Sequence, residues 1–186
     1  PYVYYVGNNP REAQKYFHGI REAVPHFKAI AIFDRTEQEL PSESDLRFLM
    51  WNRREIENYL CYPETLLAYA RKSAVTESPG PLFKDSEVDC HIVIMQECIG
   101  ELEDALNKMD KGSPWNDNFK VSDDFLVPLF KNYFKKLKIP NVLEKKNFHE
   151  LAYYVPKEKI DPEVKEKLDM IVKVAKSAQH PSYINP

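Results

Sequence analysis

The sequence predicts a mixed α/β protein in which a small parallel sheet is followed by a largely helical C-terminal portion. The opening residues alternate between apolar runs and a helical repeat, as a βαβ unit does. The run Phe27–Phe33 is almost continuously apolar, which is typical of a strand in a parallel sheet that is covered on both faces. Beyond residue 86, helical spacing dominates.

The α/β unit is expected over residues 1–72. Its expected elements, in chain order, are a strand, a helix, two further strands and a short helix: Tyr2–Val6, Pro10 to Pro25, Phe27–Phe33, Leu46–Trp51 and a helix that begins at Pro63. Prolines favour the first turn of a helix, and the Gly7-Asn8-Asn9 turn separates the first strand from the first helix.

The rest of the chain is expected to be helical. Residues 73–85, rich in Ser, Thr, Pro and Gly, read as a linker or loop. Apolar residues spaced three and four apart from Val88 to Met109 predict a long helix, which with a helix over Ser122–Leu137 forms a helical insertion at 86–140. Pro128 is expected to bend the second of these helices. A C-terminal segment, 141–186, ends in a helix from Asp161 to about Ala178, with Val164, Leu168, Ile171 and Ala175 facing inward.

Composition narrows the possible classes. A chain of 186 residues with 43% hydrophobic residues and a mean hydropathy of −0.55 can bury one ordinary core. No apolar run approaches the roughly 20 residues of a membrane span, and no leader is recognisable. Three cysteines without a CxxC motif favour neither a disulfide framework nor a zinc site. We therefore expect a soluble, cytoplasmic protein that has no membrane partner.

Acidic residues form the candidate reactive group. Asp34 directly follows the apolar run Phe27–Phe33, and Glu37 is close behind it, while Glu55 and Glu57 follow the third expected strand. The carboxyl edge of a parallel sheet is where ligands bind. Oxygen ligands suit Mg²⁺ or Mn²⁺, because neither thiolate nor imidazole is nearby.

These carboxylates also have a purely structural interpretation. Glu55 and Glu57 can favour the N-terminus of a helix through its dipole, and Asp34 can cap a turn. Spacing alone favours this interpretation.

A family resemblance favours the metal-binding interpretation. A buried strand ending in Asp34-Arg35, followed by Trp51 and by the segment Arg54-Glu55-Ile56-Glu57-Asn58-Tyr59-Leu60, resembles the Toprim domain of the overcoming-lysogenization-defect (OLD) nucleases. The resemblance covers about residues 1–70. It implies a small Toprim, Rossmann-like sheet and divalent-metal-dependent, endonuclease-type hydrolysis of nucleic-acid phosphodiesters, as in phage defence.

The resemblance also implies roles for individual residues and partners. Asp34 at the strand end and Glu57 of the later segment would be metal ligands. Glu37, as a shifted substitute for a second aspartate, and Glu55 are further candidate ligands. The segment Lys145–Leu151 resembles the part of such domains that carries a basic catalytic lysine, which would be Lys145 or Lys146. Contacts to nucleic acid, DNA in preference to RNA, are expected from Arg35, Arg54, Lys131 and Lys135. The two lysines belong to a lysine-rich stretch interleaved with aromatic residues, for which spacing alone favours an ordinary solvated face of an amphipathic helix. Expected protein partners are an ATPase domain, of the same or another chain, and a second copy of this chain.

The sequence departs from the family pattern at two places. Thr36 stands where the family has a second aspartate, and the glutamate on the family's first strand has no counterpart after Tyr2. We therefore expect a fragment that lacks the first Toprim strand. The alternative is a catalytically degenerate interaction or oligomerisation module, which would use the apolar seam from Val88 to Met109 to bind a partner.

Overall fold

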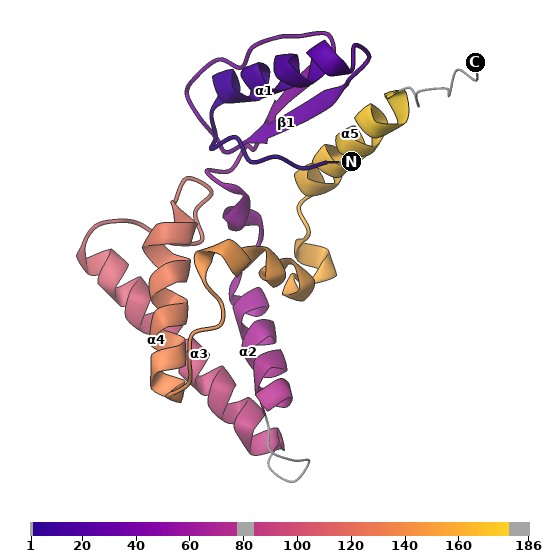
Figure 1. The fold of residues 1–186 in the computed structure, drawn as a ribbon. Coiled ribbons are helices and arrows are strands. Elements are labelled where there is room, and N and C mark those ends of the chain that lie inside the picture. Colours follow the sequence, from indigo (N-terminus) through magenta and orange to yellow (C-terminus); the bar gives the residue numbers. More distant parts are fainter. Residues whose placement is uncertain (1, 78–83, 179–186) are drawn as a thin grey trace. The chain divides into compact units, whose positions relative to one another are not determined.

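The computed structural model describes residues 2–77 and 84–178 (Figure 1). The chain forms two compact units. The sheet unit comprises residues 1–52 and 161–186, and the helical unit comprises residues 53–160. Residues 53–72, expected in the first segment, thus belong to the helical unit, whereas the last helix joins the sheet unit.

The described residues of the sheet unit form two helices and a parallel pair of strands, which confirms the mixed α/β class. Its elements are α1 (Pro10–Ala23), β1 (Ala29–Phe33), β2 (Leu46–Met50) and α5 (Pro162–Ser177). The strands pair in register from Ala29 opposite Leu46 to Phe33 opposite Met50. Both helices contact β1 (Figure 1).

The two helices of this unit begin where the sequence indicates. The Asn9 side chain accepts a hydrogen bond from the Arg11 N–H, and the Asp161 side chain accepts one from the Glu163 N–H. Each cap precedes a proline in the first turn, where a missing N–H costs nothing. These local signals therefore suffice to place both N-termini.

The strand expected at Tyr2–Val6 is wrong. Among the described residues the sheet has only β1 and β2, and this segment has no regular secondary structure. The side chains from Tyr2 to Tyr5 are exposed, up to 89% for Val3. Tyr4 stacks on Tyr16 of α1 with ring centroids 3.8 Å apart. The segment therefore contacts α1 through an aromatic pair that its continuous apolar run does not reveal.

The described residues of the helical unit form three α-helices and several shorter helical turns. The elements, in chain order, are a 3₁₀ turn, α2, α3, a π-helical turn, α4 and two 3₁₀ segments: Ile56–Tyr59, Pro63–Glu77, Lys84–Lys108, Ser122–Leu126, Val127–Leu137, Lys145–Tyr154 and Lys157–Lys159. Part of the expected linker is thus helical, since α2 extends to Glu77; residues 78–83 lie outside the described part.

The segment expected as a helix over Ser122–Leu137 is helical throughout. A π-helical turn over Ser122–Leu126 leads directly into α4, and Pro128 lies in the first turn of α4. A proline cannot donate to the helical hydrogen-bond ladder, and π-helical turns interrupt that ladder, so the two irregularities lie next to each other. The bend expected at Pro128 stays a prediction.

The core of the helical unit is aromatic and aliphatic. The apolar seam of α3, which includes Met95 and Ile99, packs against α4 residues such as Phe130 and Phe134. Phe130 is fully buried, and its ring lies edge-on to that of Tyr69 from α2 at 5.3 Å. This packing gives the seam an intramolecular partner.

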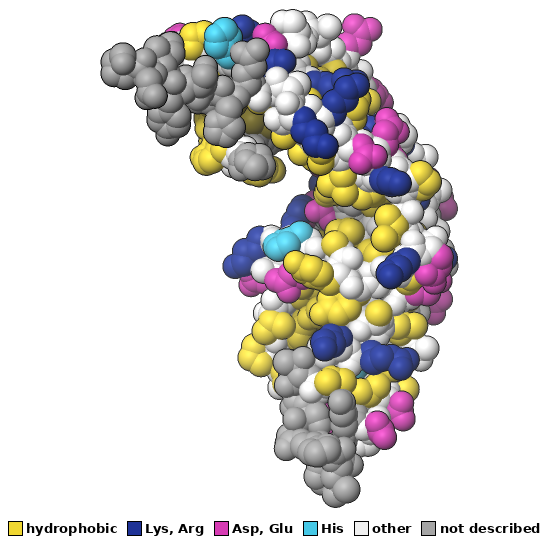
Figure 2. All heavy atoms as spheres, turned by 90° about the vertical axis from the view of Figure 1, so that its right-hand side faces the viewer, with side chains coloured by type: hydrophobic (Ala, Val, Ile, Leu, Met, Phe, Trp, Pro, Cys, Tyr) yellow, Lys and Arg dark blue, Asp and Glu magenta, His cyan; other side chains and the backbone are white. Residues whose placement is uncertain are grey.

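The described surface is mixed in charge. Figure 2 shows basic and acidic side chains interspersed on one face of the molecule. Among the residues that the structure describes, no helix combines the length and the apolar character that crossing a membrane requires.

Candidate functional site

The carboxyl ends of the two parallel strands lie side by side in the sheet unit. Asp34 follows β1, and Trp51 and Asn52 follow β2. The Trp51 N–H donates to the carbonyl oxygen of Phe33 at 2.9 Å, which continues the pairing past the last registered residues. Asp34 is therefore positioned at the edge where parallel sheets bind ligands.

A left-handed turn supports Asp34 from the N-terminal side. Gly7 and Asn8 both have positive φ, 59° and 54°, which glycine and asparagine tolerate best. This turn directs the Asn8 side chain to the end of β1, where its Oδ1 accepts a hydrogen bond from the Asp34 N–H at 2.8 Å. The Asp34 backbone is thus held by a residue 26 positions earlier.

Arg35 links the ends of the two strands. Its guanidinium donates to the carbonyl oxygen of Asn52 at 3.0 Å, while the side chain stays exposed. The Thr36 N–H lies 3.2 Å from the Met50 sulfur. A cation therefore stands beside Asp34 at this edge, and its side chain is accessible to a ligand.

A buried ion pair completes the edge, and the sequence analysis did not find it. Glu163 and Lys167 of α5 are 8% and 9% exposed, and their charged atoms are 3.2 Å apart. Glu163 also accepts from the Asn52 N–H at 3.0 Å, and the Lys167 ammonium lies 6.0 Å from the centroid of the Trp51 ring. The pair thus anchors α5 to the end of β2.

The inward face expected for α5 is only partly right. Val164 and Ile171 are partly buried, but Leu168, which is 56% exposed, and Ala175 face solvent, and the buried residues of this helix are Glu163 and Lys167. The pair lies one turn apart in the first turns of the helix, a spacing that was visible in the sequence. Charged residues are rarely buried unless they are paired, so the pattern gave no reason to place them inside.

The expected metal ligands are divided between the two units. Asp34 is half-buried and Glu37 exposed in the sheet unit, whereas Glu55 and Glu57 belong to the helical unit. Among the described residues, no three His, Cys, Asp or Glu side chains gather in a way that could hold a metal ion. The expectation that Asp34 and Glu57 share an ion stays a prediction.

Glu55 has a structural role within the helical unit. It caps the 3₁₀ turn Ile56–Tyr59 in a capping box with Asn58 and is 6% exposed. Its two oxygens accept hydrogen bonds from the Ser122 N–H at 2.5 Å and the Ser122 hydroxyl at 3.0 Å. Burial, and secondarily the Glu55 charge, raises the pKa of the neighbouring Cys61 thiol well above its ordinary value.

The expected basic residues of the helical unit lie on its surface. Lys145 pairs with Asp123, and hydrogen bonds from Lys120 and then Lys145 lower the pKa of that carboxyl. Lys146 pairs with Glu144 at 3.0 Å. Three further predicted contacts are exposed: Arg54, Lys131 and Lys135. Their expected roles in catalysis and nucleic-acid binding stay predictions.

A buried polar group also connects the three helices of the helical unit. His91 Nδ1 lies 2.8 Å from the Tyr133 hydroxyl, and Ser73 Oγ lies 3.4 Å from that nitrogen. His91 is 4% exposed and Tyr133 is fully buried, so a substrate has no access to the nitrogen–hydroxyl contact. The group therefore stabilises the packing of α2, α3 and α4.

Replacing Tyr133 by phenylalanine tests this structural role. The change keeps the ring and removes one partner of the buried imidazole, so we expect the free energy of unfolding to fall by about 1–3 kcal/mol. Urea unfolding followed by the fluorescence of Trp115, which lies in the same unit, measures the change. Tyr153→Phe, at an 87% exposed position, is the control and should have no effect.

Comparison of this chain with protein-family models, with curated proteins and with solved structures finds no match.

Proposed function

We propose that this chain takes part in metal-dependent cleavage of nucleic-acid phosphodiesters, as a Toprim-like part of an OLD-type ATPase–nuclease. The observation that carries the proposal is the carboxyl edge of the parallel pair, where Asp34 stands at the end of β1 beside Arg35. A carboxylate and a guanidinium at one sheet edge can bind a cation and a phosphate, respectively.

The residues present fit a magnesium or manganese ion that is shared with substrate. Mg²⁺ usually binds through one or two carboxylates together with substrate phosphates, so a cage of three protein carboxylates is not needed. Asp34 would supply the protein oxygen, and Arg35 would orient the phosphate and offset charge on it. The metal, when bound, supplies activation of water and neutralisation of charge on the phosphate.

A second candidate function is a non-catalytic interaction module. Both Glu55 oxygens are used inside the helical unit, and Thr36 offers a neutral oxygen where the Toprim resemblance implies an aspartate. The exposed aromatic segment that includes Tyr2 and Tyr5 would be available to a protein partner. The two candidates differ in whether Asp34 binds metal.

Replacing Asp34 by asparagine tests the proposed function. Loss of the anionic ligand should weaken Mn²⁺ binding, measured by titration calorimetry, and should reduce Mn²⁺-dependent cleavage of labelled DNA and RNA at least about a hundredfold. The control is Glu22→Gln, which removes an exposed carboxylate from α1 of the same unit. Melting temperatures of both variants establish that the fold is retained.

The outcomes separate the two candidates. The metal site is supported if the wild-type chain binds Mn²⁺, Asp34→Asn removes that binding and Glu22→Gln preserves it. A wild-type protein that neither binds Mn²⁺ nor cleaves nucleic acid supports the interaction module and rejects the nuclease.

A further inference from the structure

Two adjoining hollows lie at the amino ends of the strands, at the opposite end of the sheet from Asp34. Their volumes are about 250 and 180 Å³, and Lys28 and Asp45, which precede β1 and β2, line both of them. The Ala29 N–H donates to the Asp45 carbonyl oxygen at 2.9 Å, which holds the two strand entries together. The two hollows therefore share lining residues, Lys28 and Asp45, where a backbone hydrogen bond joins the beginnings of the two strands.

The lining of these hollows is strongly basic, and it comes from every element of the sheet unit. Arg21 lies on α1, Lys28 precedes β1, Arg47 lies on β2 and Lys173 lies on α5. Asp45 is the one carboxylate among the lining residues. Since the whole chain has a net charge of −3, this concentration of cations is a local feature.

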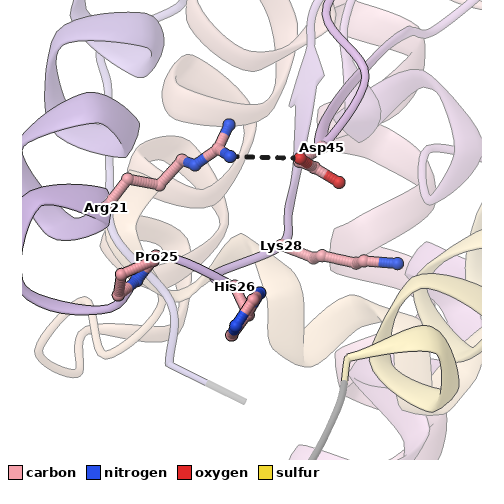
Figure 3. A pocket seen from close by; sticks show the side chains of 5 residues that line it. All are labelled: Arg21, Pro25, His26, Lys28 and Asp45. Atoms are coloured by element: carbon pink, nitrogen blue, oxygen red, sulfur yellow. Dashed lines mark ion pairs between the residues drawn. The ribbon is translucent and has the colours of Figure 1, made fainter.

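Of the four lining cations, only Arg21 forms an ion pair with Asp45, the carboxylate of the lining. Arg21 reaches from α1 to Asp45, 3.4 Å away (Figure 3). Its guanidinium also lies over the Phe17 ring. Lys28 extends away from Arg21 (Figure 3). Among the described residues, no carboxylate is within ion-pair distance of Lys28, Arg47 or Lys173. Three cations are therefore available to an anionic ligand.

The size and chemistry of the hollows favour phosphate groups. Both are smaller than the roughly 300–1,000 Å³ of pockets that enclose drug-sized ligands. Ser44 and Ser177 add hydroxyl groups to the cations of the second hollow. Lysine, arginine and serine side chains are the usual partners of phosphate oxygens. Because the hollows adjoin and share Lys28, they fit consecutive phosphates better than one isolated anion.

We propose that this basic amino edge, formed by Arg21, Lys28, Arg47 and Lys173, binds the phosphate backbone of a nucleic-acid strand. The proposal does not depend on metal binding, because none of these residues belongs to the carboxyl edge that contains Asp34. Binding through the backbone is independent of base sequence and falls steeply with salt.

The test uses the full chain and a fluorescein-labelled single-stranded DNA oligonucleotide, with affinity measured by anisotropy over a series of NaCl concentrations. The variant Lys28→Gln/Arg47→Gln/Lys173→Gln should bind at least about tenfold more weakly, and the slope of log K against log[salt] should become shallower by about 2. The matched control is Arg11→Gln/Lys15→Gln/Lys165→Gln, which removes the same charges from exposed positions of the same unit.

The proposal is overturned if the wild-type chain does not bind the oligonucleotide, or if the triple variant and the control lose affinity for it equally. It is also overturned if polyglutamate of the same charge displaces the oligonucleotide. The last outcome would indicate an acidic-peptide site, and displacement by inorganic phosphate at equal phosphate concentration would indicate a site for a free anion. If the triple variant does not fold, the single variant Lys173→Gln replaces it in the test. Lys173 is exposed on its helix, so this variant should fold and should still bind the oligonucleotide more weakly than the wild-type chain.

A final variant separates this proposal from the proposed function. Asp34→Asn should bind the oligonucleotide with wild-type affinity in the absence of divalent metal. Loss of binding in this variant would show that the carboxyl edge, and not the amino edge, holds the strand.

Discussion

Replacing Lys167 by methionine is expected to lower the free energy of unfolding of the sheet unit by about 3–5 kcal/mol. The change leaves the buried Glu163 carboxylate without the ammonium that lies 3.2 Å away. It also removes the cation beside the Trp51 ring. Removing one partner of a buried ion pair lowers the free energy of unfolding by more than the intact pair contributes to it, because the remaining charge stays buried away from water.

Urea unfolding measures this effect separately in the sheet unit. The chain has two tryptophans, Trp51 in the sheet unit and Trp115 in the helical unit. In a Trp115→Phe background, Trp51 fluorescence therefore reports the sheet unit. Lys165→Met, at an exposed position of the same helix, is the control.

A double variant determines whether the charge is the cause. Glu163→Gln/Lys167→Met removes both charges and should recover much of the lost stability, since an uncompensated buried carboxylate no longer exists. If the double variant is as unstable as Lys167→Met, the loss comes from packing of the lysine stem and not from charge.

Replacing Glu55 by alanine is expected to lower the free energy of unfolding of the helical unit by about 2–4 kcal/mol. The variant loses the acceptor for the buried Ser122 N–H and hydroxyl, as well as the cap of the turn Ile56–Tyr59. A buried donor without a partner costs its full desolvation free energy.

Trp115 fluorescence in a Trp51→Phe background follows unfolding of the helical unit during urea titration. The matched control is Glu158→Ala, which removes an exposed carboxylate from the same unit. Unchanged stability of Glu55→Ala, together with weakened Mn²⁺ binding, would contradict the structural role and would favour Glu55 as a metal ligand.

Local signals in the sequence were enough to predict several elements. Asn9-Pro10 and Asp161-Pro162 combine a capping side chain with a proline, and α1 and α5 begin there. The continuous apolar run around Ala29–Phe33 is a strand of a parallel pair, as such a run predicts. These predictions succeed because capping, proline geometry and strand burial act over a few neighbouring residues.

Residue type alone did not separate structural from reactive carboxylates. Glu55 and Asp34 follow strand-like segments in the same way in the sequence. Tertiary contacts give Glu55 two hydrogen bonds from Ser122, 67 residues later, whereas Asp34 receives an Asn8 contact at its backbone N–H. The sequence could nominate both residues but could not show that Glu55 is used as an internal acceptor.

The sequence alone was thus enough to predict the N-termini of α1 and α5, the parallel strand pair and the position of Asp34 at the end of a strand. Folding alone decided that Glu163 and Lys167 are buried while Leu168 is exposed, and that Lys28, Arg47 and Lys173 line adjoining hollows. Helical periodicity shows which side chains share a face, but it does not show which face another element covers. That depends on contacts between residues more than a hundred positions apart, such as Asn52 and Glu163, which no local pattern encodes.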